Sequence, residues 1–286
     1  MIVITGAGGA LFGRPVLDAL LKLVPADRII AGSRSPGQAA WPADVRVRRL
    51  DFDDADSLAA GFAGARTVLV NGTNYGTPPD HRRAQHARAL RAAVAAGAAR
   101  IVYTTWPDPD RSPLPSMADF AESEALLRGL PVDWTILRTT YGLAQTVGRD
   151  VTTAIATGVL AAPAEGARTT PAHIDDLAEA TARVLASDGH AGRRYTLTAA
   201  DTVDWPDLAR LASRIAGRPI AYRPISDDAF TDAMRAQGVP DATAELLLAV
   251  YQAFRQGWTA DPAPDLGALL GRAPRTAIDA VAAVTG

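Results

Sequence analysis

The stretch "IVITGAGGALFGRPVLDALL", residues 2–21, decides the fold. Its apolar start, residues 2–5, predicts a short buried strand, and residues 14–23 carry apolar side chains at helical spacing. Glycines crowd the turn between these two segments. A glycine-rich turn from a strand into a helix is typical of a dinucleotide phosphate site, because the helix N-terminus offers free N–H groups and a partial positive charge.

The spacing of these glycines departs from both common patterns. Gly6, Gly9 and Gly13 fit neither G-x-G-x-x-G nor G-x-x-G-x-x-G, and Phe12 stands where the second pattern expects its third glycine. The proline two residues after the last glycine suits the first turn of a helix. We therefore expect the helix to begin between Phe12 and Arg14, after a loop that is one residue longer than usual. A plain glycine-rich turn is the alternative.

Strand-like and helix-like segments alternate along the first half of the chain. Further strands are expected at residues 28–33, 45–52, 67–72, 100–105 and 133–139, and helices at 54–64, 80–97 and 116–128. These β-α-β repeats predict an α/β fold of the Rossmann-like type, a doubly wound parallel sheet with helices on both faces. After residue 200 the pattern changes to helices and loops. We expect a dinucleotide-binding domain over residues 1–199 and a smaller, mainly helical substrate lobe over 200–286, to which residues 142–172 contribute in part.

The composition excludes several kinds of protein. With a net charge of -2, the chain has no electrostatic reason to bind nucleic acid or an acidic membrane. It has no cysteine, which excludes disulfides and thiolate chemistry. The start lacks the basic segment of a secretory signal, and no apolar run approaches the ~18 residues of a membrane span. We expect a soluble cytoplasmic protein, monomeric or homodimeric, that acts on a small molecule.

The end of the second expected strand, "AGSRSPG" at residues 31–37, bears on the choice of cofactor. An NAD site usually carries an acidic residue here for the ribose hydroxyls, whereas this chain has Ser33 and Arg34. A guanidinium can pair bidentately with a 2′-phosphate, so NADP(H) is favoured over NAD(H), with a solvated arginine in a turn as the alternative. Asp51 and Phe52, after the third strand, are candidates for contact with adenine, although Asp51 could instead flank a helix.

Several segments, taken together and in order, resemble the NmrA-like branch of the atypical short-chain dehydrogenases/reductases. They are "TGAGGALFG", "GSRSP", "LDFDD", "AAVAAGAARIVYTT", "WTILRTTYG", "TPAHIDDLAEATARVL", "RRYTLTAA" and "GRAPRT". Within that branch the chain looks most like bacterial NAD(P)H:quinone oxidoreductases and the related triphenylmethane dye reductases. The resemblance implies a Rossmann domain, a small C-terminal lobe and a substrate cleft between them.

The resemblance also implies NADP(H) as cofactor and gives roles to particular residues. The pyrophosphate should lie on the loop of Gly6, Gly8, Gly9, Ala10, Leu11 and Phe12, and the 2′-phosphate on Arg34. Asn71 and Gly72 should lie against the cofactor ribose, Thr104 and Thr105 near the nicotinamide ribose, and Thr139, Thr140 and Tyr141 beside the nicotinamide.

Most short-chain reductases use a Tyr-x-x-x-Lys pair, in which the lysine lowers the pKa of the tyrosine. This chain lacks the pattern, and its only lysine, Lys22, lies in the first expected helix. A ketone would become a strongly basic alkoxide that needs such an acid. Hydride addition to a quinone instead gives a phenolate-like anion, whose conjugate acid has a pKa of ~10. We therefore predict an NADPH-dependent oxidoreductase that passes hydride to a quinone-like or conjugated small molecule.

Tyr75, Trp106 and Tyr141 follow expected strand ends and are candidates to line an aromatic-friendly substrate pocket, although ordinary packing would explain them equally well. Two alternative functions stay open. One is a regulatory protein that senses NADP(H) without turnover, as some NmrA-like members do. The other is a biosynthetic ketoreductase or epimerase of an aromatic polyketide-type substrate, with Tyr141 as proton donor. The segment "LRTTYG" leaves room for it, because the quinone reductases have "LRNGWY" there.

Other polar residues are expected to be structural. His81 and His86 are five residues apart without matching carboxylates, so no metal site is expected. The arginines of the same helix are expected to form a solvated face: Arg82, Arg83, Arg88 and Arg91. Asp176 and Glu179 have the spacing of a helix cap.

Overall fold

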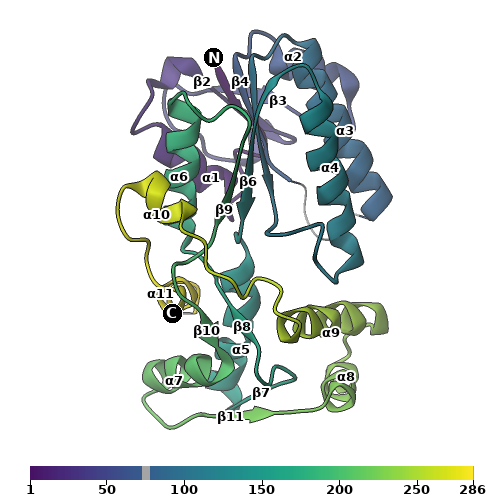
Figure 1. The fold of residues 1–286 in the computed structure, drawn as a ribbon, viewed down its shortest axis with the longest axis vertical. Coiled ribbons are helices and arrows are strands. Elements are labelled where there is room, and N and C mark those ends of the chain that lie inside the picture. The colour runs from purple at the N-terminus through teal and green to yellow at the C-terminus, as the bar shows by residue number, and fades with distance from the viewer. Residues whose placement is uncertain (73–77, 286) are drawn as a thin grey trace.

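A parallel sheet of seven strands forms the centre of the protein in this computed structural model, which describes residues 1–72 and 78–285 (Figure 1). The strand order is β3-β2-β1-β4-β5-β6-β9, and neighbouring strands run parallel. The strands are β1 (Ile2–Ile4), β2 (Ile29–Ser33), β3 (Arg46–Arg49), β4 (Thr67–Val70), β5 (Arg100–Thr105), β6 (Asp133–Thr139) and β9 (Arg193–Leu197). The order reverses between β1 and β4, which is the doubly wound, Rossmann-like topology that the sequence predicts. That prediction is confirmed.

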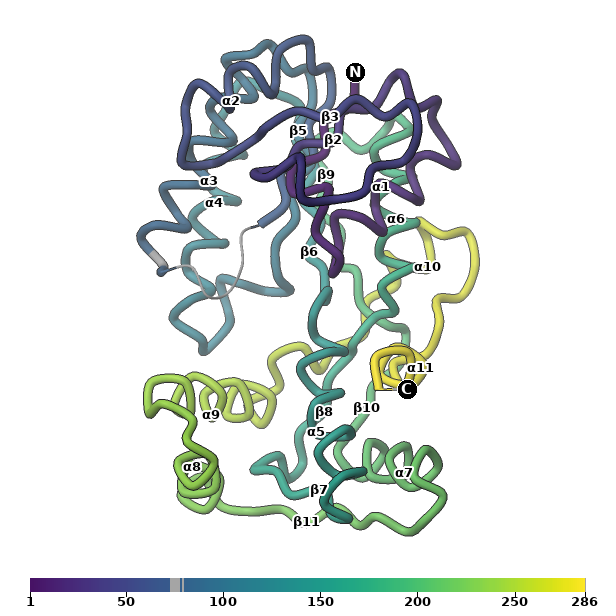
Figure 2. The backbone as a smooth tube through the Cα atoms, turned by 180° about the vertical axis from the view of Figure 1, so that it is seen from behind, coloured from purple at the N-terminus to yellow at the C-terminus, as the bar shows by residue number. Residues whose placement is uncertain are grey.

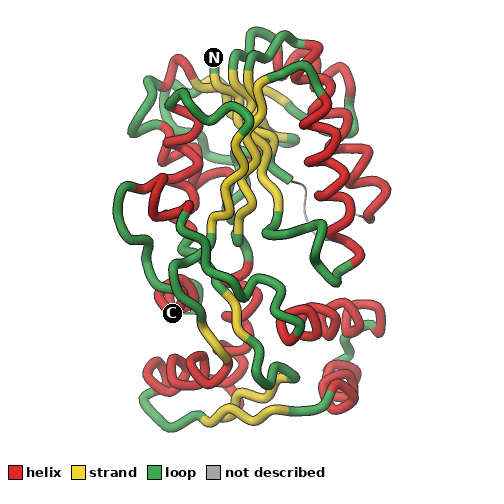
Figure 3. The backbone as a smooth tube through the Cα atoms, in the orientation of Figure 1, coloured by secondary structure: helices red, strands yellow, loops and turns green. Residues whose placement is uncertain are grey.

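Helices cover both faces of the sheet, as Figures 1 and 3 show. One face carries α1 (Gly13–Leu20), α6 (Ile174–Ala186) and α10 (Asp265–Leu270), and the other carries α2 (Ala55–Phe62), α3 (Pro79–Ala95) and α4 (Ala118–Gly129). Short 3-10 turns lie at Ala26–Arg28, Pro36–Gln38 and Pro115–Met117. Of the helices that the structure describes, none is both long and apolar enough to cross a membrane.

Successive residues of the inner strands point to opposite faces of the sheet. Val68 and Val70 of β4 belong to the apolar cluster under α2, α3 and α4, whereas Leu69 belongs to the cluster under α1 and α6. Ile136 and Leu137 of β6 divide in the same way. Because helices cover both faces, these strands are apolar on both sides, and their carboxyl ends meet at one edge of the sheet.

A second group of elements lies beyond that edge, below the sheet in Figure 1. Its helices are α5 (Leu143–Thr157), α7 (Trp205–Ala216), α8 (Asp227–Ala236) and α9 (Asp241–Arg255). Two small sheets pair β8 (Arg168–Thr169) with β10 (Val203–Asp204) and β7 (Val159–Ala162) with β11 (Ala221–Pro224). The last helix, α11 (Ala277–Ala282), packs against α5 close to the C-terminus (Figure 2).

The structure differs from the sequence predictions in this lower group and at β9, a strand of the central sheet that was not predicted. The sequence predicts helices and loops after residue 200, but β10 and β11 pair there with strands that precede α6. These strands have two and four residues, too few for an alternating pattern to show. The expected strand at 45–52 is also shorter, because the chain after Arg49 turns into α2.

Candidate functional site

The glycine loop leaves the carboxyl end of β1 and turns at Gly6, whose φ of 62° lies in the left-handed region that glycine favours. Gly13 is the first residue of α1, within the range that the sequence predicts. A Cβ at Gly13 would lie 2.0 Å from the carbonyl oxygen of Gly6, a distance that two backbone segments cannot accommodate. Gly13 therefore allows the close helix–strand approach of the third motif glycine, after a loop that is one residue longer.

The N-terminal end of α1 can receive an anion. Its N-cap, Phe12, makes no capping hydrogen bond, and its first turn contains no acidic residue. Phe12 itself is buried, whereas Gly8, Gly9, Ala10 and Leu11 are exposed. Amide groups at a helix N-terminus carry partial positive charge and need hydrogen-bond acceptors, so this loop suits a pyrophosphate.

A loop after β2 folds back onto the glycine loop. Arg14 Nη1 donates to the carbonyl oxygen of Ala40 at 2.7 Å, and Trp41 Nε1 donates to that of Pro36 at 2.7 Å. The indole of Trp41 lies against Gly8, where a Cβ would come within 3.3 Å of the ring. Trp41 could not be singled out from the sequence, because a tryptophan in an irregular loop belongs to no periodic pattern.

Arg34 follows the end of β2 on the same side as the glycine loop. Its side chain is exposed and forms no hydrogen bond or ion pair with a described residue. The neighbouring Ser33 hydroxyl accepts from the N–H of Ser35 at 3.2 Å. A guanidinium without a protein partner at this position is available to a phosphate group.

Asp51 and Phe52 both make contacts within the fold. The Asp51 carboxylate accepts from the N–H of Asp53 at 3.1 Å and from Arg49 Nη2 at 3.2 Å, in the turn that leads to α2. Phe52 is 8% exposed and belongs to the apolar cluster that α2 covers. The geometry of Asp51 agrees with the helix-flanking alternative.

Asn71 joins the ends of three strands. Its N–H donates to Thr5 Oγ1 at 2.9 Å, and its side-chain amide donates to the carbonyl oxygen of Thr5 at 2.7 Å. Thr104 Oγ1 donates to Asn71 Oδ1 at 3.3 Å and accepts from the N–H of Gly72 at 3.1 Å. A Cβ at Gly72 would lie 2.9 Å from the Phe120 ring, so only glycine fits there without a shift. These contacts bring Asn71, Gly72 and Thr104 together at the edge that carries the glycine loop.

Threonine hydroxyls are buried where β5 and β6 end. Thr105 Oγ1 and Thr139 Oγ1 make no hydrogen bond within the part of the chain that the structure describes. Thr140 differs, since its hydroxyl donates to the carbonyl oxygen of Leu197 at 3.3 Å and accepts from the N–H of Ala172 at 3.1 Å. A buried polar group without a partner costs about 1–3 kcal/mol. Thr105 and Thr139 therefore fit a site in which a bound group supplies the missing bonds, whereas Thr140 ties the sheet together.

Aromatic rings extend from the glycine loop toward the lower elements. Phe12 stacks on Tyr141 with ring centroids 4.9 Å apart, and Tyr141 lies 5.9 Å from Trp106. Trp106 lies in turn 5.8 Å from Trp258, whose Nε1 donates to the carbonyl oxygen of Pro107 at 3.1 Å. Trp258 belongs to the segment after α9, so these rings join the sheet edge to the lower group. No sequence pattern pointed to Trp258.

Tyr141 is half-buried, and burial raises the pKa of its hydroxyl to about 12, against a smaller lowering by the charge of Arg82. A phenol with this pKa stays protonated at neutral pH and is a weak acid. The other expected pocket tyrosine, Tyr75, lies outside the described residues.

Arg138 holds the turn that follows Trp106. It is 3% exposed and donates to both carboxylate oxygens of Glu124, at 3.0 and 2.9 Å. It also donates to Asp108 at 2.8 Å and to Asp110 at 3.2 Å. Asp108 has a φ of 40°, a strained value for a residue other than glycine, and Arg138 helps to keep it there.

A cavity of about 240 Å³ lies beside Tyr141, between the first turns of α5 and α6 and the end of the chain. Its lining residues are Tyr141, Gly142, Ala144, Gln145, Ala172, His173, Ile174, Asp175, Ala280, Ala283 and Val284. Most of these side chains are small or apolar, so the cavity suits an apolar part of a ligand.

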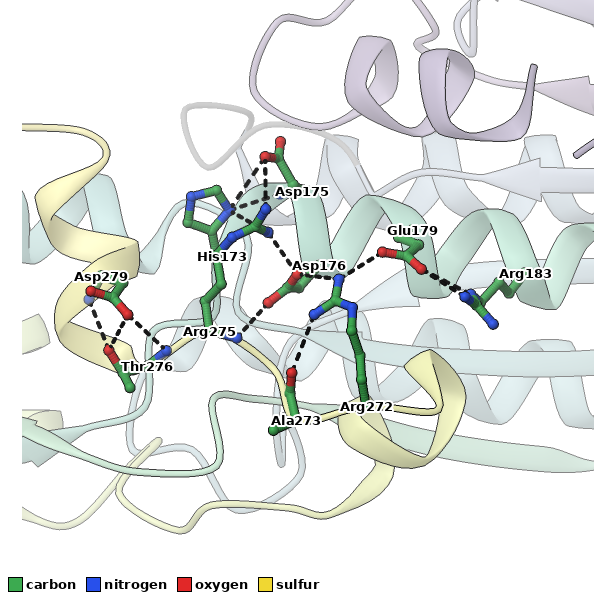
Figure 4. A network of polar contacts seen from close by, with 10 residues as sticks. All are labelled: His173, Asp175, Asp176, Glu179, Arg183, Arg272, Ala273, Arg275, Thr276 and Asp279. Atoms are coloured by element: carbon green, nitrogen blue, oxygen red, sulfur yellow. Dashed lines mark hydrogen bonds and ion pairs between the residues drawn. The ribbon is translucent and has the colours of Figure 1, made fainter. Parts of the chain in front are cut away.

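The wall of this cavity that α11 supplies is held by an ion-pair network, shown in Figure 4. Asp176 is fully buried and accepts from Arg272 Nη2 at 2.9 Å, from Arg275 Nη1 at 2.7 Å and from the N–H of Arg275 at 2.7 Å. The expected capping role of Asp176 is wrong, because the N-cap of α6 is His173, whose ring accepts from the N–H of Asp175. Asp176 instead fixes the segment before α11, a contact between residues far apart in the sequence.

The arginines of α3 are of two kinds. Arg83, Arg88 and Arg91 are exposed, as the sequence predicts, but Arg82 is 1% exposed. The prediction is wrong for Arg82, because α4 packs on this part of α3 and its Asp119 pairs with the guanidinium at 3.0 Å.

Comparison with known proteins bears on this site. A family model described as NAD(P)H-binding matches residues 6–188. Quinone oxidoreductase 2 of Escherichia coli is 30% identical over 284 residues, which cover 98% of this chain and 97% of that protein. The (4-alkanoyl-5-oxo-2,5-dihydrofuran-3-yl)methyl phosphate reductase of Streptomyces griseus is 28% identical over 280 residues, covering 96% of this chain and 94% of that protein. Among solved structures, the Citrobacter sp. triphenylmethane reductase complexed with NADP(H) has a TM-score of 0.91 and 28% identity, and 100% of both chains is covered.

Proposed function

This chain belongs to the NAD(P)H-binding family, and from that premise we propose that it is an NADPH-dependent oxidoreductase that reduces quinone-like or conjugated small molecules without a flavin. The names of its relatives support an oxidoreductase, since they include a quinone oxidoreductase and a triphenylmethane reductase. The resemblance of its sequence segments to NmrA-like reductases points to the same class. The finer choice of acceptor rests on the side chains described above.

The cofactor that we assign is NADP(H), which supplies a hydride from its nicotinamide ring when bound. The N–H groups of the glycine loop and the N-terminus of α1 take the pyrophosphate, and Arg34 takes the 2′-phosphate. Asn71 keeps the strand ends aligned beneath the ribose. The hydroxyls of Thr105 and Thr139 form hydrogen bonds with the nicotinamide end of the cofactor, which supplies the partners that they lack among the described residues.

The acceptor that we assign is flat and conjugated. Tyr141, Trp106 and Trp258 offer ring surface on which a planar molecule can stack, and they keep water from the transferring hydrogen. We assign the substrate side to residues 200–286 with a contribution from 142–172, and cofactor binding to residues 1–199. The Tyr-x-x-x-Lys pair is absent, so the reduced acceptor must be either an anion that water can protonate or a neutral product that needs no proton.

The observation that carries this proposal is that the buried hydroxyls of Thr105 and Thr139, at the sheet edge that bears the glycine loop, have no hydrogen-bond partner among the described residues. The test is the decay of NADPH absorbance with a benzoquinone, a naphthoquinone, a cationic triarylmethane dye and a simple ketone. We expect turnover with the first three and none with the ketone. Calorimetric binding of NADPH without turnover of any acceptor would overturn the catalytic proposal and favour an NADP(H) sensor.

A second candidate function, a biosynthetic ketoreductase with Tyr141 as proton donor, is favoured by one observation. The Tyr141 hydroxyl makes no hydrogen bond to a described residue, so it is free to meet a substrate oxygen. Tyr141→Phe separates the two candidates, because a proton donor contributes about 10²–10⁴-fold in rate. A loss within about threefold on quinones, with no ketone reduction by the wild type, leaves the quinone-like acceptor as the assignment.

A further inference from the structure

Arg82 is a buried cation that none of the assignments above uses. It lies near the start of α3 and is 1% exposed. Its Nε and Nη2 both donate to Asp119, at 3.2 and 3.0 Å, and Nη2 also donates to the carbonyl oxygen of Ser116 at 3.1 Å. The guanidinium carbon lies 5.1 Å from the ring centroid of Phe120. The N–H groups of Nε and Nη2, on one edge of the guanidinium, therefore all have hydrogen-bond acceptors.

The remaining nitrogen of Arg82, Nη1, differs from the other two in this respect. Nη1 is buried and has no hydrogen-bond partner among the described residues. Because the guanidinium is a planar fork, Nη1 lies away from the edge that meets Asp119. A charged donor without a partner is costly in a protein interior, and a role toward a bound molecule is one explanation for such a group. Nη1 is thus a candidate to meet a bound molecule.

Arg82 lies close to the edge of the sheet where the candidate site is. Phe120, which its guanidinium covers, is the ring that a Cβ at Gly72 would meet at 2.9 Å. Gly72 in turn donates to Thr104 at the end of β5. The positive charge also reaches Tyr141, whose pKa it lowers against the larger effect of burial. Arg82 is therefore separated from the strand ends by one aromatic ring.

The charged groups around Arg82 leave the electrostatic potential positive on the side of Nη1. Asp119 is the carboxylate that faces it, and Asp119 is also 3.9 Å from Arg83. The buried His86 on the same helix is neutral, since burial and the charge of Arg82 lower its pKa to about 3. No described carboxylate forms an ion pair with Nη1.

Both classes of acceptor gain one negative charge with the hydride, but they differ in the charge of the product. A neutral quinone that receives a hydride, one hydrogen with two electrons, is reduced to an anion that then takes one proton from water, while NADPH is oxidised to NADP⁺. A cationic triarylmethane dye that receives the same hydride becomes neutral and takes no proton. A fixed positive charge stabilises the first transition state and gives the second no such help.

We propose that Arg82 is the residue that stabilises the negative charge on the reduced acceptor, and that it tunes the enzyme toward neutral quinone-like acceptors over cationic ones. This inference rests on the proposed function. Arg82 would then do electrostatically part of what the tyrosine and lysine of other short-chain reductases do by proton transfer.

The test compares the two acceptor classes in the wild type and in the double variant Arg82→Gln/Asp119→Asn. The double change removes the cation without leaving the Asp119 carboxylate buried and alone. We expect kcat/KM for a neutral benzoquinone to fall at least about tenfold, and kcat/KM for the cationic dye to stay within about twofold or to rise. Arg82→Lys should keep part of the quinone activity, because it keeps the charge. Arg91→Gln, an exposed change on the same helix, is the control and should alter neither rate.

A second readout does not depend on turnover. A nitrophenol titrated in the presence of each protein with NADP⁺ reports the pKa of the bound phenol, which Arg82 should lower by about one unit relative to the double variant. An equal loss for both acceptors, or the same phenol pKa in both proteins, would overturn the role of Arg82. If the wild type reduces neither acceptor, the proposed function fails instead, and the phenol titration still decides on Arg82.

Discussion

The glycine loop and the aromatic wall, formed by Tyr141, Trp106 and Trp258, lie at the same edge of the sheet, but they are built in different ways. In the glycine loop, Gly6 and Gly13 meet through backbone atoms within a single short segment. In the aromatic wall, the hydrogen bond from Trp258 to Pro107 joins residues 151 positions apart. The proposed cofactor side is thus defined by local backbone geometry, and the proposed acceptor side by side chains that distant elements bring together. Substitutions on the acceptor side can change the substrate without altering the cofactor loop.

The largest effect is expected at Arg138, which holds the turn after Trp106 through Asp108 and Asp110. Arg138→Met leaves the buried Glu124 carboxylate without its cation, which should lower the free energy of unfolding by about 3–5 kcal/mol. Urea denaturation measures this change. Arg183→Met, which breaks an exposed ion pair with Glu179, is the matched control and should cost less than about 1 kcal/mol. Equal losses in the two variants would mean that Arg138 does not support the turn after Trp106.

Gly13→Ala tests the backbone side of the comparison. Its Cβ would lie 2.0 Å from the carbonyl oxygen of Gly6, so the loop must shift. We expect a loss of about 3 kcal/mol in stability and, because the loop is displaced, NADPH binding at least about 100-fold weaker. Fluorescence titration and thermal melting measure the two effects. Gly129→Ala is the control, because a Cβ there meets nothing within 4 Å, and unchanged binding in Gly13→Ala would refute the close-packing role.

Substitution of Asp150 tests the lower group, apart from the glycine loop and the aromatic wall. Burial raises the pKa of its carboxyl to about 6, although Tyr251 and Trp205 donate hydrogen bonds to it. The folded state therefore holds this proton more tightly than the unfolded state, so the stabilisation is complete at low pH and is lost as the pH rises through about 6. Between about pH 4.5 and 7 the wild type should lose about 2 kcal/mol relative to Asp150→Asn.

The measurement for Asp150 is urea denaturation of both proteins across that pH range. The same substitution at the exposed Asp261 controls for the loss of one formal charge. If the difference between the wild type and Asp150→Asn does not change with pH, the carboxyl is not protonated in the folded protein at low pH in the way described.

Arg34→Ala tests the cofactor assignment at the end of β2. We expect NADPH to bind about tenfold more weakly, about 1.4 kcal/mol, and NADH to bind as before, because only NADPH carries the 2′-phosphate. Calorimetry with both cofactors measures this. Arg66→Ala, an exposed arginine at the opposite edge of the sheet, is the control. A wild type that prefers NADH would contradict the assignment outright.

The smallest effect is expected for Trp258→Phe on the acceptor side. The change keeps an aromatic ring but loses the hydrogen bond to Pro107, worth about 1 kcal/mol. KM for a quinone should rise severalfold while the Kd for NADPH stays constant, which steady-state kinetics and fluorescence titration measure. An equal change in both constants would mean that the two sides are not independent.

Much of the cofactor half could be predicted from the sequence. β5 and β6 have the predicted bounds, and α1 begins at Gly13, inside the predicted range. These features depend on patterns within ten or so residues, which local sequence encodes directly. The Asp176 prediction failed because the partners of this residue are distant in the sequence. Its spacing suits a helix cap, but Arg272 and Arg275, near the end of the chain, donate to its carboxylate.

The amino-acid sequence alone determined the α/β alternation, the glycine turn, the position of Arg34 and the absence of a Tyr-x-x-x-Lys pair. Only the tertiary structure decided that Arg82 is buried while Arg83 is exposed, and that Trp258 meets Trp106. The physical reason is that a periodic pattern fixes which face of an element is apolar. Which element covers that face depends on the packing of all the others.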